Sequence, residues 1–165
     1  MLRKLGIISV LSLIVVALTA SVAVAQNPAF KNRGGPFATD QGKTLNVTGT
    51  LVGLGNAGGQ TIEVVATGQP IVECTNPSGK NEPPGQQPPA GTFTSGPLPI
   101  APEDITRSGQ YTFNITTLEP VVPQVCKTTP GWSQTLVDVE FTSYQVIVNG
   151  INLGTFTNIT PTPTV

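Results

Sequence analysis

The side chains that could take part in chemistry are carboxylates, two cysteines and a few aromatic rings, because the chain contains no histidine. Among its nine acidic residues, only Glu103-Asp104 and the pair Asp138 and Glu140 stand close together. Residues 138 and 140 share one face of an expected strand, where they could hold a calcium ion weakly with loop carbonyls. A solvated strand face opposite buried Val137, Val139 and Phe141 is the simpler interpretation. We therefore expect no metal, no cofactor and no catalytic residue.

The two cysteines, Cys74 and Cys126, are best explained as a structural disulfide. A role as metal ligand or nucleophile would call for a histidine partner or a CxxC spacing, and the sequence has neither. Two cysteines in an oxidising compartment pair with each other by default. Closing a loop of this length is worth roughly 4 kcal/mol in the chain-entropy model.

Three aromatic side chains, Trp132, Tyr111 and Tyr144, offer a second kind of chemistry, because aromatic faces can stack on sugar rings. Both tyrosines lie in segments of strand-like alternation, where packing in or near the core is the usual role. Trp132 follows the second cysteine closely and is expected to cover the disulfide. Core packing is therefore the preferred interpretation, with a sugar-stacking platform as the alternative.

The first 25 residues have the pattern of an export signal. Arg3 and Lys4 form a basic start, an apolar run follows, and Ala23-Val24-Ala25 is a small-x-small sequence before a cleavage point at Gln26. The apolar run is shorter than the roughly 20 residues that cross a bilayer. We expect a secreted or periplasmic protein with no membrane span after cleavage, rather than a membrane-anchored one.

The composition of the chain after residue 25 limits its partners. Those 140 residues are enough for one domain with one core, and they carry six basic against nine acidic side chains, a formal charge of 6 − 9 = −3. Because no basic stripe is present to neutralise phosphates, nucleic acid and anionic lipid are excluded as expected partners. An extracellular protein or a glycan remains.

Threonine, valine, glycine and proline are abundant, which favours strands and turns over helices. Alternating apolar residues predict about seven short strands between residues 44 and 157, flanked by a flexible arm over 26–43 and a flexible tail over 158–165. The strands at 45–51 and 62–66 are expected to pair through a glycine-rich turn. A bulge is expected near Thr142-Ser143, and Asn149-Gly150 predicts a tight hairpin.

These features predict an all-β fold, a single antiparallel β-sandwich with Ig-like or Greek-key connections. A small closed barrel is the alternative. The Cys-Trp-Cys order of antibody domains is absent, since Trp132 follows both cysteines.

The segment from Asn76 to Pro89 is rich in proline and has no large apolar side chain, so it predicts a long surface loop. Loops of this length without structure of their own are often functional, although others are tolerated insertions. As an interaction loop it would present six polar side chains, namely Asn76, Lys80, Asn81, Glu82, Gln86 and Gln87.

Several stretches together resemble a group of small exported bacterial proteins. They are Val72–Lys80, with its Cys-Thr-Asn-Pro-x-Gly motif, the continuation Pro84-Gly85-Gln86, the later Cys126 and Trp132, and Val137–Ser143. The resemblance covers roughly residues 44–157 and implies a signal peptide and a β-sandwich with one disulfide, without an assigned activity.

The expected function is thus that of a secreted, non-catalytic interaction or structural module at the cell surface or in the extracellular space. The alternative is a carbohydrate-binding or weakly calcium-binding accessory protein.

Overall fold

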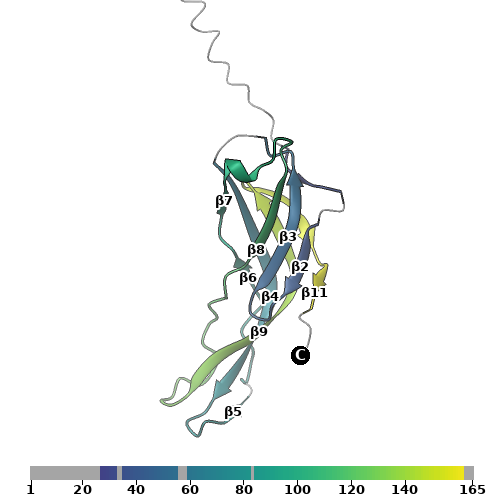
Figure 1. Cartoon of the computed structure of the whole chain (residues 1–165). Helices are drawn as coiled ribbons and strands as arrows, with labels where there is room; N and C mark the ends of the chain where they lie inside the picture. The colour runs from purple at the N-terminus through teal and green to yellow at the C-terminus, as the bar shows by residue number, and fades with distance from the viewer. Residues whose placement is uncertain (1–26, 33–34, 56–58, 83, 162–165) are drawn as a thin grey trace, which may run out of the picture.

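The computed structural model describes residues 27–32, 35–55, 59–82 and 84–161, and the expected signal peptide lies outside these ranges. The described residues form strands, one short 3-10 turn at Pro102–Asp104 and no α-helix (Figure 1). The strands are β1 (Ala29–Phe30), β2 (Phe37–Asp40), β3 (Leu45–Val52), β4 (Gln60–Thr75), β5 (Asn81–Glu82), β6 (Gly91–Thr94), β7 (Leu98–Ile100), β8 (Tyr111–Thr116), β9 (Ser133–Val148), β10 (Ile151–Phe156) and β11 (Ile159–Thr160).

The described strands make two sheets, and every pairing among them except that of β11 with β2 is antiparallel. In the first sheet, β3 pairs with β8 on one edge and with β1 and β2 on the other, and β11 continues beyond β2. In the second sheet, β9 lies between β10 and β4, while β7, β6 and β5 follow one another along the far edge of β4. The all-β prediction is confirmed at this level.

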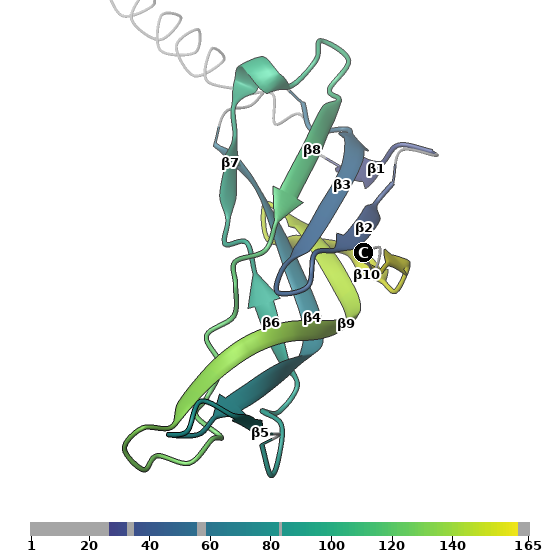
Figure 2. The same cartoon turned by 60° about the horizontal axis from the view of Figure 1, so that its bottom comes forward.

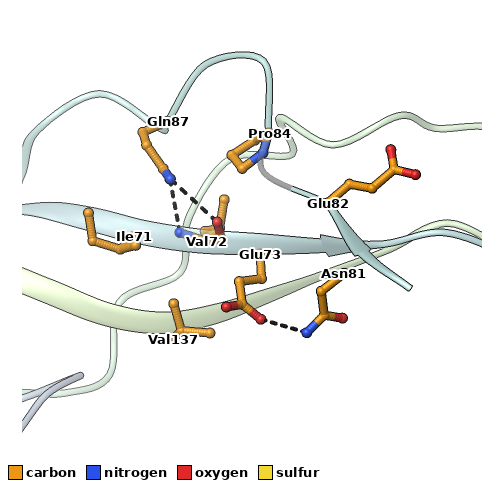
Figure 3. Close-up of a pocket in the computed structure, with 8 residues that line it drawn as sticks. All are labelled: Ile71, Val72, Glu73, Asn81, Glu82, Pro84, Gln87 and Val137. Atoms are coloured by element: carbon orange, nitrogen blue, oxygen red, sulfur yellow. Dashed lines mark hydrogen bonds between the residues drawn. The ribbon is translucent and has the colours of Figure 1, made fainter. Parts of the chain in front are cut away.

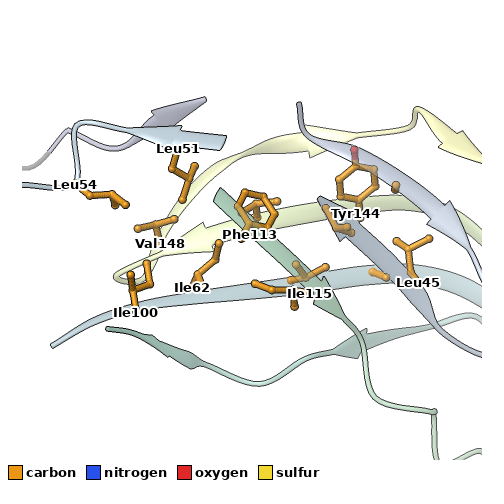
Figure 4. Close-up of a cluster of buried hydrophobic side chains, with 14 of the residues drawn as sticks. Leu45, Leu51, Leu54, Ile62, Ile100, Phe113, Ile115, Tyr144 and Val148 are labelled. Carbon is orange, nitrogen blue, oxygen red and sulfur yellow. The ribbon is translucent and has the colours of Figure 1, made fainter. Parts of the chain in front are cut away.

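The core lies between the two sheets (Figure 4). Leu45, Val47 and Leu51 alternate along β3 with no exposed surface, and they pack against residues of β4 and β9 such as Val64 and Val146. Burying one such side chain contributes about 1.5–3 kcal/mol, so the strict alternation fixes which face of each strand turns inward. The predicted period-two pattern therefore determines which side chains lie between the two sheets.

The strands β4 and β9 are far longer than the others, and their outer halves continue beyond the sandwich (Figures 1 and 2). Together with β5 and segments 76–90 and 119–132 they form what we call the distal lobe. A second, smaller apolar cluster of Val72, Leu136 and Val139 lies there, with Phe93, Val122, Val125 and Phe141 packed against it. The sequence predicts two short strands where the structure has one continuous β4.

Two irregularities adjust the pairing of β9 with β4. Thr142 is the extra residue between the pairs Thr67–Ser143 and Gly68–Phe141, which confirms the bulge expected at this position. Gly68 is required there, because an added Cβ would lie 2.9 Å from the carbonyl oxygen of Glu140 in the bulged strand. The bulge changes which residues face inward, and Phe141 and Tyr144 both reach apolar clusters as a result.

A second bulge, which the sequence did not predict, places Val137 between the pairs Val72–Leu136 and Ile71–Asp138. Leu136 takes the inward position with 8% of its surface exposed, and Val137 is 38% exposed. The expectation that Val137 is buried is therefore wrong. One inserted residue reverses the parity of a strand, and nothing in the local sequence marks the insertion.

In the described parts of the expected arm over 26–43 and the expected tail over 158–165, the chain forms the strands β1, β2 and β11. Ala38 of β2 is 2% exposed and pairs with Val47, and β11 lies parallel to β2 through Ile159. These short strands are ordered by pairing with their neighbours and by the few apolar side chains, such as Ala38, that reach the core. Tyr144 also holds both segments against β9, since its hydroxyl lies 3.1 Å from both Pro36 O and Asn158 Oδ1.

The glycine-rich segment after β3 does not close a hairpin. β3 and β4 belong to different sheets, so the predicted pairing of 45–51 with 62–66 is wrong. In the described part of the connection, Leu54 is fully buried and its carbonyl accepts the Gln60 side-chain amide at 2.7 Å. The hairpin at Asn149-Gly150 is confirmed, with φ of 51° and 77° at the two turn residues.

We predict that Tyr144→Phe destabilises the fold by about 1–2 kcal/mol, because Pro36 O and Asn158 Oδ1 lose a buried partner. Burial raises the pKa of Tyr144 to about 12, while hydrogen bonding to Asn158 opposes this. Above pH 10 the unfolded chain then loses a proton that the folded chain keeps, so wild-type stability falls between pH 10 and 12. Urea unfolding across this range should show a shallower loss for the variant. An identical slope would contradict the assignment.

Candidate binding site in the distal lobe

A pocket of about 330 Å³ opens on the distal lobe beside the outer edge of β4 (Figure 3). Residues of four segments line it, namely Ile71, Val72 and Glu73 of β4, Asn81 and Glu82 of β5, Pro84 and Gln87 of the following loop, and Val137 of β9. The pocket combines an apolar part with amide and carboxylate groups, which is the usual composition of a site for a small ligand or a single side chain.

The pocket exists because β4 lacks a neighbouring strand at this point. β6 ends its pairing at Gly68 and β5 begins at Cys74, so among the described strands none pairs with Gln69–Glu73 except β9 on the other edge. Gln87 occupies this gap. Its Oε1 accepts the backbone N–H of Val72 at 2.9 Å, and its Nε2 donates to the carbonyl of Val72 at 3.4 Å.

The Gln87 side chain therefore imitates one peptide group of a missing strand. Gln69 adds a second link, because its side-chain amide donates to the carbonyl of Pro88 and so holds the same loop. Pro70 has no N–H to leave unpaired. Side chains thus form hydrogen bonds with the backbone groups of β4 that face the gap. The part of the gap that they do not fill is the pocket.

The charged groups of the pocket are two carboxylates. Glu73 accepts a hydrogen bond from Asn81 Nδ2 at 2.9 Å, and Glu82 accepts one from Asn76 Nδ2 at 2.8 Å. In Figure 3 the Glu73 carboxylate lies between Val137 and Asn81, whereas the Glu82 carboxylate points away toward the outer end. None of the described residues that line the pocket is basic. The pocket therefore presents negative charge beside the partly exposed methyl groups of Ile71 and Val137.

The disulfide between Cys74 and Cys126 is confirmed, with their Cα atoms 5.6 Å apart. It joins the tip of β4 to segment 119–132 and so fixes the end of the lobe next to the pocket. Trp132 and both cysteines line a smaller cavity of about 80 Å³, which fits the expectation that Trp132 covers the disulfide. The Lys127 ammonium lies 4.6 Å from the centre of the Trp132 ring.

Gln134 is a positioning residue that the sequence did not indicate. Its Oε1 accepts the backbone N–H groups of Val125 at 2.8 Å and Cys126 at 3.2 Å, and its Nε2 donates to the carbonyl of Pro123 at 2.9 Å. One strand side chain thus orders the segment that carries the second cysteine. Only its place opposite Cys74 in the β4–β9 register, which requires the fold, distinguishes it from other glutamines.

The six polar residues predicted for an interaction loop divide into three groups. Asn76 closes a tight turn, since its Oδ1 accepts the backbone N–H of Ser78 at 2.9 Å and of Lys80 at 3.0 Å. Asn81, Glu82 and Gln87 line the pocket, whereas Lys80 and Gln86 are exposed outside it. The loop is less free than predicted, because Asn81 and Glu82 form β5 against β4.

The acidic residues and the aromatic residues that the sequence suggested as sites do not come together in the described structure. In the described part of the chain no three histidine, cysteine or acidic residues group as a metal site. Asp138 instead lies near Asp40; burial raises the pKa of Asp40, and the charge of Asp138 adds to the shift. Tyr144 is buried in the sandwich core and Trp132 lies in the distal lobe, so no shared platform forms.

No protein-family model, curated protein or solved structure matches this chain. Within the described residues, no helix has the length and apolar character that a membrane span requires.

We predict that Gln87→Ala lowers the free energy of unfolding by about 1 kcal/mol, because the Val72 backbone groups lose their partners. Gln86→Ala is the matched control, since Gln86 is the exposed neighbour of Gln87 and lies outside the pocket lining. It should change stability by less than about 0.5 kcal/mol. Equal effects in urea unfolding would show that Gln87 does not hold the loop.

We also predict that replacing both cysteines by serine costs about 2–5 kcal/mol, as is usual for a native disulfide. The loss should be concentrated in the distal lobe, because the sandwich core contains neither cysteine. Amide exchange should accelerate at Val72 and Leu136 more than at Val47 and Val64. Uniform acceleration would mean that the lobe and the sandwich unfold as one unit.

Proposed function

We propose that this chain is an exported, non-catalytic binding module that acts at the cell surface or in the extracellular space, with the distal-lobe pocket as its contact site. The observation that carries the proposal is the construction of the lobe. A disulfide and the Gln134 side chain hold segment 119–132 at the tip of the lobe, and the Gln87 side chain holds the loop after β5 beside the open pocket, next to a separate apolar cluster.

This construction favours recognition because binding loses affinity when flexible segments must be ordered. Prolines restrict the backbone of segments 76–90 and 119–132, and the disulfide ties the second segment to β4. A surface that is ordered before contact loses less conformational entropy on docking. The apolar cluster of the lobe is separate from the sandwich core, so the lobe adds a surface beyond that core.

The sandwich itself fits the Ig-like or Greek-key class that we propose for it. The chain passes from the first sheet at β3 to the second at β4, returns at β8 and crosses again at β9. Such crossings are characteristic of Greek-key sandwiches, in which functional segments lie at the ends of the sheets. Fold class alone does not define a ligand, so the functional proposal rests on the pocket.

The proposal is tested in the native cell with a photo-crosslinking amino acid at position 137, inside the pocket. The control carries it at Ile151 of β10, which is 53% exposed and outside the lobe. We expect the exported chain to begin at Gln26 by mass spectrometry and to yield a cross-linked adduct from position 137 but not from 151. Glu73→Gln should weaken this capture. A chain that keeps residues 1–25, or equal adducts from both positions, would contradict the proposal.

A further inference from the structure

We propose that the occupant of the distal-lobe pocket is the Arg107 side chain of a second copy of this chain, so that copies associate head to tail. The inference rests on the proposed function, because it names the partner for the same pocket. The carboxylate of Glu73, the partly exposed methyl groups and the lack of a basic side chain among the described lining residues call for a cation on an apolar stem.

Arg107 is presented for such a contact. It lies at the tip of a turn in which Thr106 N donates to Gln110 O and Gly109 N donates to Thr106 O, both at 2.8 Å. The Thr106 hydroxyl also lies 3.0 Å from the Ser108 hydroxyl and accepts the Gln110 N–H at 3.1 Å. The turn is therefore rigid while its arginine is exposed.

Most of the other basic side chains of the described residues make contacts within the same chain. Lys43 pairs with Glu119 at 3.5 Å, Lys31 donates to Gln110 Oε1 at 3.0 Å, and Lys127 covers the Trp132 ring. Lys80 belongs to the lobe itself, two residues from Glu82, so it cannot be the group that approaches from a second copy's far end. Of the two exposed described cations without such a side-chain contact, Arg107 and Lys80, only Arg107 lies outside the distal lobe.

The position of the two groups sets the form of the assembly. The turn before β8 lies at one end of the elongated molecule and β5 with the pocket lies at the other (Figures 1 and 2). A contact between unlike ends of identical chains is heterologous, and it continues into an open row unless the rotation closes a ring. The predicted product is thus a linear assembly rather than a two-fold dimer.

The chemistry of the contact is that of a guanidinium with a carboxylate. Glu73 uses one oxygen for Asn81 Nδ2, so its other oxygen remains for an arginine N–H. The arginine methylenes would lie against Ile71 and against Val137, the residue that the second bulge exposes. The buried area of one turn in one pocket is small, so the association is weak and salt-dependent.

The test is covalent capture of the contact in the mature protein. Arg107→Lys keeps the positive charge and supplies an amine that a carbodiimide couples to a carboxylate, forming an amide with loss of water. Equal parts of unlabelled and ¹⁵N-labelled Arg107→Lys protein are mixed, coupled and digested. We expect mixed-isotope peptides in which the substituted side chain at position 107 is joined to Glu73 or Glu82. Adding Glu73→Gln and Glu82→Gln to this variant should remove them.

Sedimentation velocity of the unmodified chain gives a second readout. The sedimentation coefficient should rise with protein concentration at low salt and return to the monomer value at about 0.5 M salt. Arg107→Gln and Glu73→Gln should stay monomeric. The controls Lys43→Gln and Glu140→Gln change charge by the same amount outside both the pocket lining and the Arg107 turn, and they should behave as wild type. The double reversal Arg107→Glu with Glu73→Arg should recover association.

A monomer at every concentration without mixed-isotope links would overturn the head-to-tail contact. The photo-crosslink at position 137 then separates the two proposals. Capture of a different protein there upholds the binding function and removes the second copy as the occupant, whereas capture of nothing removes both.

Discussion

The pairing of β4 with β9 is the constraint on which the rest of the structure depends. These two strands run through the sandwich to the tip of the distal lobe, and every other described strand of the second sheet pairs with one of them. Their inner halves supply one wall of the main core, and their outer halves supply the second apolar cluster. Because one ladder serves both, the two bulges are what allow its residues to face two different cores.

Side-chain amides perform much of the pairing that backbone ladders perform elsewhere. The Gln87 side chain accepts the backbone N–H of Val72, and the Gln134 side chain accepts those of Val125 and Cys126. The Gln60 side chain donates to the backbone carbonyl of Leu54. The segments concerned contain prolines or glycines and cannot form regular ladders, yet their buried polar groups must be paired. A glutamine carries a donor and an acceptor on a long stem, so it can replace a peptide group of a strand that is absent.

The sequence predicts much of the fold and little of the site. Alternation in β3 and β8, the disulfide, the bulge at Thr142 and the turn at Asn149-Gly150 follow from local rules, and the structure confirms them. Alternation identifies a buried face but no partner, so it wrongly joined 45–51 to 62–66. The short strand β11 is ordered by β2, a neighbour distant in sequence, whereas β2 is ordered by its pairing with the next strand, β3. The pocket arises from a gap between β5 and β6, which no local pattern reveals.

The disulfide at the lobe tip has a mechanical consequence. An antiparallel pair of strands usually opens by fraying from its free end, one hydrogen bond after another. In this ribbon the outer end of β4 is joined covalently to the segment leading into β9, so fraying cannot begin there. A pull on the tip of the lobe is instead shared by the backbones of both strands. The lobe is thus built as a stiff lever rather than a hinged flap, and a load at its tip passes directly into the sandwich.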